Sequence, residues 1–157
     1  MPLTPPPRDI SGKVIPHDHQ GVLPDHWIIR RVSLEHHVVE DPKVPSGKRV
    51  TTMLFQASSE ANGGMSIDMQ NEIEQAGLDA RRFVTSPELP GSVRFQTSVL
   101  RHEGLSVGYD PIPENPHHGE VWAGRPNKWR NFKKSEQKRL LGLAVWFVVI
   151  ADVYLGP

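Results

Sequence analysis

Proline is the residue that most constrains how this chain can fold, because it makes up 15 of the 157 residues, roughly twice its average share. Each proline fixes the backbone angle φ and lacks the amide hydrogen that helix interiors and inner strands require. The regular elements should therefore be short and the connections between them long. This composition excludes a long helical bundle and a coiled coil.

The prolines are concentrated at the start of the chain, where residues 1–26 contain six of them and few apolar side chains. We expect this segment to be an extended arm that lies on the domain or is loose in solvent. Removal of residues 1–20 should then cost few contacts. The remaining residues, 27–157, have the size of one ordinary domain, so we expect a single domain there.

Short apolar runs separated by Gly and Pro predict the elements of that domain. Strands are expected at residues 27–32, 50–55, 93–99, 105–109 and 120–123. A short helix is expected after Asp68, which can cap it, and Gly77 should end it. A C-terminal helix is expected over residues 137–151, with Ser135 as its N-cap. Strands and helices do not alternate regularly, so the sequence predicts an α+β fold in which these two helices pack on a mostly antiparallel sheet.

Charge and cysteine content exclude several classes of protein. Lys plus Arg and Asp plus Glu both total 18, so no global field attracts a polyanion. The chain has no cysteine, which excludes disulfides, thiolate metal sites and cysteine nucleophiles. The apolar run at residues 140–151 is shorter than the roughly 20 residues that span a bilayer. We therefore expect a buried helix there, no membrane partner and a cytoplasmic location.

The most distinctive stretch is the loop at residues 110–119, in which three prolines within six residues stiffen the backbone. A rigid loop can hold a histidine and a carboxylate within hydrogen-bonding reach, as acid–base catalysis requires. We expect one polar concavity, lined by Arg30, Ser66, Asp110, Asn115 and His118. The alternative is a stiff structural connection whose polar side chains bind their own backbone.

Strand alternation sets the expected orientation of the two adjacent histidines in this loop. His118 and Glu120 should share one face of the following strand, while His117 points away. In this hypothesis His118 exchanges protons, Arg30 holds an anionic group and Ser66 orients it.

Arg30 and Arg31 should point to opposite faces of the first strand, so that one of them faces inward. A buried guanidinium needs a carboxylate or a phosphate-bearing ligand as its partner. Alternatively the strand lies at an edge and both side chains reach water.

A basic segment follows, with seven Lys and Arg residues within 125–139 and Trp129 and Phe132 among them. This pattern suits a nucleotide or a single-stranded nucleic acid, with phosphates on the cations and bases on the rings. The candidate phosphate-binding residues are Arg125, Lys128, Trp129 and Arg130. The alternative is that this segment is the solvent-exposed beginning of a helix and that its aromatic residues belong to the core.

Histidine pairs offer a weaker pattern for a metal site. His17, Asp18 and His19 could combine with Asp25 and His26, or with His36 and His37. No H-E-x-x-H motif is present, and adjacent histidines are usually solvated, so we expect no metal.

Four short motifs carry a resemblance: Arg30 on a first strand, Phe55-x-x-Ser58, Ser66-x-Asp68 and Asp110-Pro-x-Pro-x-Asn115-Pro-x-His118. In this order, over about residues 27–145, they resemble a group of small uncharacterised bacterial proteins. This resemblance implies a bacterial cytoplasmic protein.

The chain is also distantly similar to ADP-ribosyltransferase-like domains, in which Arg30, Ser58 and Glu120 would match the arginine, serine and glutamate positions. This similarity implies NAD as a cofactor, although the motifs themselves imply none. The serine-threonine-serine triplet of those domains is absent, and His118 stands two positions before Glu120.

Two functions follow as hypotheses. In the first, the protein is a small enzyme that acts on a nucleotide or nucleic acid through a pocket that contains Arg30, Ser66 and His118. In the second, it is a binding or regulatory module without catalysis, such as one half of a toxin–antitoxin pair, and a hydrophobic patch binds its protein partner.

Overall fold

The computed structural model describes residues 2–57 and 63–157. The strands are β1 (Trp27–Val32), β2 (Val38–Glu40), β3 (Lys48–Val50), β4 (Met65–Met69), β5 (Gly91–Gln96), β6 (Ser106–Tyr109), β7 (His118–Arg125), β8 (Lys128–Arg130) and β9 (Val145–Val148). The helices are α1 (Leu34–His37), α2 (Gln70–Gln75), α3 (Ala80–Phe83), α4 (Thr97–His102) and α5 (Lys134–Leu143), with a 3₁₀ helix η1 (Thr52–Phe55).

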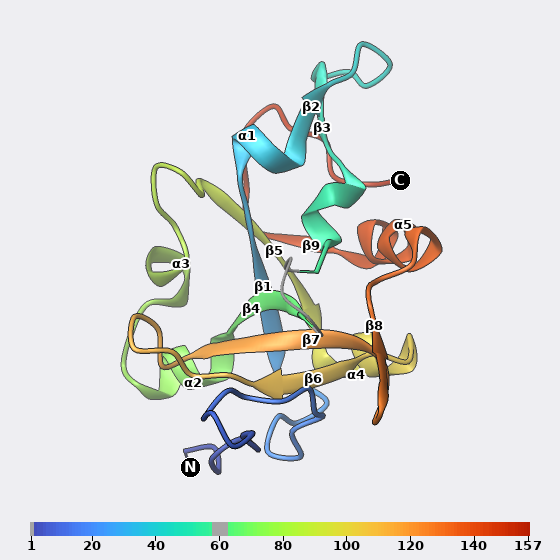
Figure 1. Ribbon diagram of the computed structural model, residues 1–157. Helices are drawn as coiled ribbons and strands as arrows, with labels where there is room; N and C mark the ends of the chain where they lie inside the picture. Colours follow the sequence, from blue (N-terminus) through green and yellow to red (C-terminus); the bar gives the residue numbers. More distant parts are fainter. Residues whose placement is uncertain (1, 58–62) are drawn as a thin grey trace.

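Within the described residues the main sheet has the strand order β6-β7-β4-β1-β5-β9, with β8 paired to β7, and β2 and β3 form a separate hairpin. Each of these pairings is antiparallel. Figure 1 shows β6 and β7 running across the molecule while β1 and β5 run steeply. The predicted α+β class with a mostly antiparallel sheet is therefore confirmed.

The two faces of the sheet are covered by different helices. Ile28 of β1 belongs to a large buried cluster that includes Leu54 of η1 and Leu140 of α5. Ile29, the next residue, belongs to a smaller cluster with Ile73 of α2 and residues of α3. Successive residues of β1 therefore face opposite layers, as strand geometry requires.

Strands β1 and β4 pair over only a short distance. Their register joins Ile28 to Met69 and Ile29 to Asp68. Beyond these pairs the end of β1 and the start of β4 separate, and the sheet is split between them. Through this split, a side chain that leaves a strand on one face of the sheet can approach side chains on the other face.

The strand predicted at residues 50–55 is wrong. Strand β3 ends at Val50, and the chain then forms η1, whose N-cap Thr51 accepts a hydrogen bond from the Met53 amide at 3.3 Å. Leu54 and Phe55 are both fully buried. A helical turn can bury two consecutive side chains in one core, whereas a strand would direct them to opposite faces.

The C-terminal helix is shorter than predicted and begins earlier. Its N-cap is Lys133 rather than Ser135, and the Glu136 carboxylate accepts the Lys133 amide at 2.8 Å. The helix ends at Leu143, and the apolar residues that follow form β9, which pairs with β5. β-Branched and aromatic residues suit a strand when a partner strand is available. In residues 2–57 and 63–157 no helix has the length and apolar character of a membrane span.

Two further boundaries differ from expectation. Asp68 does not cap a helix, because it lies within β4 and α2 begins at Gln70 without a side-chain cap. The strand predicted at 93–99 ends at Gln96, since Thr97 begins α4 and bonds to the His26 carbonyl oxygen through its amide at 2.8 Å. The strands predicted at 105–109 and 120–123 are present, the latter extended to the whole of β7.

The N-terminal arm lies along the outer edge of β6, below the sheet in Figure 1. The His19 amide donates to the Val107 oxygen at 2.8 Å, and the Val107 amide donates to the Asp18 carboxylate at 2.9 Å. Asp18 also pairs with Arg101, and Val14 and His19 are buried. The expectation that residues 1–20 make few contacts is therefore wrong.

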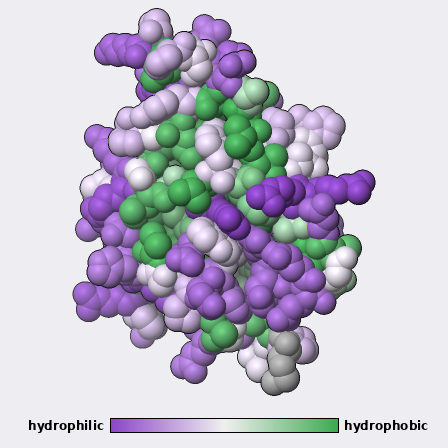
Figure 2. All heavy atoms as spheres, turned by 180° about the vertical axis from the view of Figure 1, so that it is seen from behind, coloured by the Kyte–Doolittle hydropathy of each residue, from purple (hydrophilic) through white to green (hydrophobic). Residues whose placement is uncertain are grey.

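Strand β9 forms the opposite edge of the sheet and lies behind β1 in Figure 1. The rear view in Figure 2 shows apolar residues gathered over the upper half of this face. Large exposed apolar side chains in and after α5 are Leu143, Val145, Val149 and Tyr154. The Arg81 guanidinium donates to the Phe147 oxygen at 3.3 Å and so covers part of the strand edge.

Candidate functional site

A hollow of about 540 Å³ lies where β1 and β4 separate, beneath the loop at residues 110–117. It is lined by Arg30, Arg31, His37, Ser66, Ile67, Asp68, Phe83, Leu89, Ile112, Glu114, Asn115 and His118. Four of the five residues expected in one concavity thus line it, and the fifth, Asp110, contacts His118. The chain segments that meet here are far apart in sequence.

Arg30 reaches the hollow through the split in the sheet. The site hypothesis required Arg30 and His118 to lie on one face of the sheet, and this condition is not met. By strand alternation the Arg30 side chain leaves β1 on the Ile28 face, opposite to the face that carries His118. Its Nε donates to the Leu54 oxygen at 2.8 Å, and one terminal nitrogen donates to the Ser66 oxygen at 2.9 Å. The bond to Ser66 links β1 to β4 across the split, and the bond to Leu54 links β1 to η1.

The Arg30 guanidinium forms no ion pair with a carboxylate in the described part of the chain, since both of its hydrogen-bond acceptors are neutral carbonyl oxygens. Burial lowers the pKa of Arg30 to about 10, and the more distant Asp68 charge opposes this shift. Arg30 is still protonated at neutral pH. The Arg30 charge thus has no directly bonded carboxylate, although the carboxylates of Asp68, which pairs with Arg31, and of Glu114 also line the hollow.

His37 lines the same hollow and is neutral. The Ser33 side chain caps α1, and the Ser33 amide donates to Nδ1 of His37 at 2.9 Å. Nδ1 is thus an acceptor, so the ring hydrogen is on Nε2. Burial and the charge of Arg30 lower the pKa of His37 to about 4. At neutral pH this ring therefore presents an N–H donor without adding charge.

His118 has the opposite tautomer. Its Nδ1 lies 2.7 Å from the Asp110 backbone oxygen and 3.6 Å from the Asp110 carboxylate. A carbonyl oxygen only accepts hydrogen bonds, so Nδ1 carries the hydrogen and Nε2 keeps the lone pair. An imidazole that is oriented through Nδ1 and basic at Nε2 is suited to accept a proton.

Arg31, Asp68 and Asn115 form a network that fixes the loop to the sheet. Arg31 donates twice to the Asp68 carboxylate, at 2.7 and 2.9 Å, and Asn115 Nδ2 donates to it at 2.7 Å. The Asn115 side-chain oxygen accepts the His117 amide at 2.9 Å. Arg31 therefore has the carboxylate partner expected for an inward-facing arginine, and Asn115 positions the loop.

His117 points away from this hollow, as strand alternation led us to expect. Its ring contacts Phe83 with 5.4 Å between ring centroids, and it lines a different hollow. Ser66 lines the site, whereas Ser58 lies outside the described residues. Glu120 does not line the hollow, and its carboxylate accepts the Gly64 amide at 3.3 Å.

One group of three potential metal ligands occurs in the described residues. Ligand atoms of Asp110, His118 and Glu120 lie within 4.8 Å of one another. However, Nδ1 of His118 already donates to the Asp110 oxygen, and a cation bound at Nδ1 would have to replace that bond.

The histidines of the arm have other partners. Nε2 of His17 accepts the Tyr109 amide at 3.1 Å, and Nε2 of His19 donates to the Thr4 oxygen at 2.9 Å. These contacts hold the arm in place. The described residues bring neither His26 nor the His36–His37 pair into a ligand group with them.

Two residues of the basic segment have structural partners. Arg130 forms two hydrogen bonds with Glu136, at 2.7 and 3.1 Å, and Phe132 is buried in the core. Arg125, Lys128 and Trp129 lie on the β7–β8 hairpin and do not line the hollow.

The sequence analysis did not identify His37 as a residue of this site. The available signal was the spacing Ser33-x-x-x-His37 directly after a predicted strand, which suits a capped single turn that brings His37 back toward Arg30. Comparisons with protein-family models, with curated proteins and with solved structures found no match to this chain.

Proposed function

We propose that the protein is a small enzyme whose hollow binds a phosphate-bearing molecule of the nucleotide class, and that His118 exchanges a proton with this substrate. The observation that carries the proposal is the partly buried Arg30 guanidinium, which has carbonyl oxygens but no carboxylate of the described residues as partners. A buried cation without a counter-ion is costly. A bound anion would remove that cost.

The donors of the hollow fit a phosphate group. Arg30 supplies a charged, planar donor, which suits phosphate oxygens. His37 supplies a second donor and remains neutral, because its pKa is about 4. The volume of about 540 Å³ lies within the range of small-molecule sites and suits one nucleotide better than a polymer.

The position of His118 supports proton transfer at the same site. Its Nε2 can accept a proton from a water molecule or a substrate hydroxyl that attacks, and can return that proton to a leaving group. Asp110 holds the ring in the required tautomer through Nδ1. The Ser66 hydroxyl is available to orient the bound anion, since Ser66 lines the hollow.

A titration with nucleoside monophosphates and inorganic phosphate, followed by calorimetry, tests this proposal. Arg30→Gln should weaken binding at least about tenfold, the effect of losing a charge-assisted hydrogen bond. His118→Gln should leave nucleotide affinity within about threefold and remove any turnover found with the wild-type protein. His117→Gln and Arg49→Gln should change neither quantity, because both residues lie outside the hollow. Equal phosphate affinity of wild type and Arg30→Gln would overturn the proposal.

The binding-module hypothesis is favoured by a different observation, the exposed apolar side chains of the segment that follows α5. If this hypothesis holds, Val149→Ser should abolish capture of a protein partner, whereas Arg30→Gln should not. The enzyme hypothesis predicts instead that Arg30→Gln weakens nucleotide binding and that Val149→Ser leaves it unchanged.

A further inference from the structure

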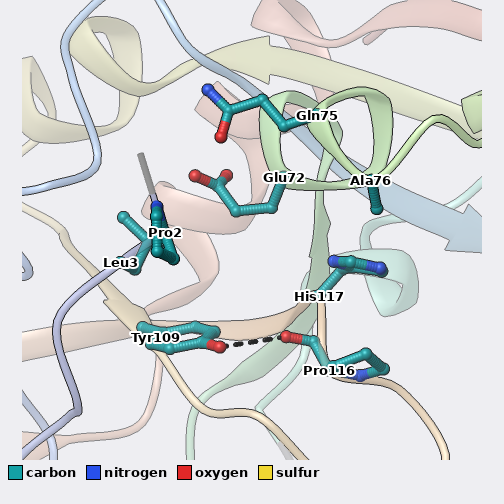
Figure 3. A pocket seen from close by; sticks show the side chains of 8 residues that line it. All are labelled: Pro2, Leu3, Glu72, Gln75, Ala76, Tyr109, Pro116 and His117. Atoms are coloured by element: carbon teal, nitrogen blue, oxygen red, sulfur yellow. Dashed lines mark hydrogen bonds between the residues drawn. The ribbon is translucent and has the colours of Figure 1, made fainter.

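A second hollow, of about 620 Å³, lies on the other side of the loop that carries His118 (Figure 3). It is lined by Pro2, Leu3, Glu72, Gln75, Ala76, Tyr109, Pro116 and His117. It shares no lining residue with the Arg30 hollow. Its ligand chemistry can therefore be considered separately.

The Glu72 carboxylate is the principal charged group of this second hollow. One of its oxygens, Oε2, is buried and has no hydrogen-bond partner in the described residues. Figure 3 shows this carboxylate extending from α2 toward Pro2 and Leu3, with Tyr109 below it. A buried carboxylate oxygen without a donor is costly, and a ligand that donates to it removes this cost.

The other polar lining residues are Tyr109, Gln75 and His117, of which the last two can donate as well as accept hydrogen bonds. The Tyr109 hydroxyl donates its hydrogen to the Pro116 oxygen at 3.2 Å, which leaves the lone pairs of the hydroxyl available. Burial and the Glu72 charge raise the pKa of Tyr109, so the phenol stays neutral. A ligand that binds to both the Glu72 carboxylate and the Tyr109 hydroxyl oxygen must therefore supply donors and, to match Glu72, a positive charge.

Apart from Gln75 and His117, the remaining walls are apolar. Pro2, Leu3, Ala76 and the Tyr109 ring surround the polar atoms. A strongly hydrated inorganic cation gains nothing from such walls, whereas an alkyl chain does. The aromatic ring also favours a cation near its face.

We infer that this second hollow binds an alkylammonium group, with the ammonium donating to Glu72 and its alkyl chain lying against Leu3 and Tyr109. Two sources share this chemistry, a free diamine and the lysine side chain of a peptide. The inference does not depend on the proposed nucleotide site, because it rests on different residues and the opposite charge.

Binding can be followed by ¹H–¹⁵N NMR on the full chain, from the amide shifts of α2 and Tyr109. The probes are 1,4-diaminobutane, Nα-acetyl-lysine amide and Nα-acetyl-norleucine amide, which has a similar alkyl chain and no charge. Glu72→Gln removes the charge of the hollow and keeps its shape. Glu74→Gln is the matched control, since Glu74 lies on the same helix but bonds to Gln70.

We expect saturable shifts with at least one ammonium probe and none with the norleucine amide. Glu72→Gln should weaken ammonium binding at least about tenfold, and Glu74→Gln should change it less than about twofold. Tighter binding of the diamine would identify a free amine as the ligand class, and tighter binding of the lysine amide would identify a peptide. Equal affinities for wild type and Glu72→Gln, or equal shifts from the norleucine amide, would overturn the inference.

Discussion

Arg30 and His37 share one hollow, and the positive charge of the arginine opposes a positive charge on the histidine. Burial and the Arg30 guanidinium together lower the pKa of His37 from 6.5 to about 4. Between these two pH values the unfolded chain binds a proton at His37 that the folded chain does not. The free energy of unfolding should therefore be fully retained above pH 6.5 and fall as the pH decreases toward 4.

The first prediction follows from this linkage. His37→Asn keeps an acceptor for the Ser33 amide and removes the titrating ring, so its urea midpoint should fall less than that of wild type between about pH 7 and about pH 5. His36→Gln is the control, because its side chain is 70% exposed and it should behave as wild type. Parallel curves for wild type and His37→Asn would contradict the assignment.

A second prediction concerns the carboxylate that connects the sheet to the loop. Asp68→Asn should lower the free energy of unfolding by about 3 kcal/mol, because it leaves Arg31 without its charged partner in a half-buried position. Glu103→Gln, which removes the partner of the more exposed Arg139, should cost about 1 kcal/mol or less. Urea unfolding at neutral pH measures both, and equal costs would show that the Asp68 network is not stabilising.

The parts of the fold that were predicted correctly depend on local patterns. Strand β1 and the strand before the loop have alternating or β-branched sequences, and prolines mark the loop between two strands. The prediction for the apolar run at residues 140–151 is wrong only after Leu143, because the composition of residues 145–148 fits a buried helix as well as an edge strand. Pairing with β5 decides between them, and that contact is not encoded in the run itself.

The candidate site could be predicted only in part, for a similar reason. The face that His118 occupies follows from alternation along one strand. Arg30 reaches the same hollow only because β1 and β4 separate after two residue pairs, which is a tertiary feature. The partners of Arg31 and Asn115 likewise come from β4, far away in the sequence.

The third prediction concerns the N-terminal arm. Deletion of residues 2–20 should lower the melting temperature by more than about 5 °C, roughly 1.5 kcal/mol for a domain of this size. The deletion removes the hydrogen bonds to Val107 and uncovers the edge of β6. Asp18→Ala should reproduce part of the loss, since Asp18 also pairs with Arg101. A melting temperature unchanged by the deletion would show that the arm is not bound to the domain in solution.

The fourth prediction tests the strand that replaces the end of the expected helix. Phe147 is 5% exposed and packs with Ile29 and Ile73, and the Arg81 guanidinium lies 4.5 Å from the centre of its ring. Phe147→Ala should therefore cost about 3 to 4 kcal/mol of unfolding free energy. Val149→Ala is the comparison, because Val149 is 66% exposed and its truncation should cost less than about 0.5 kcal/mol. Chemical denaturation of both variants gives the two values. If they were equal, residues 145–148 would not pack as β9 against β5, and the continuous helix over residues 137–151 would regain support.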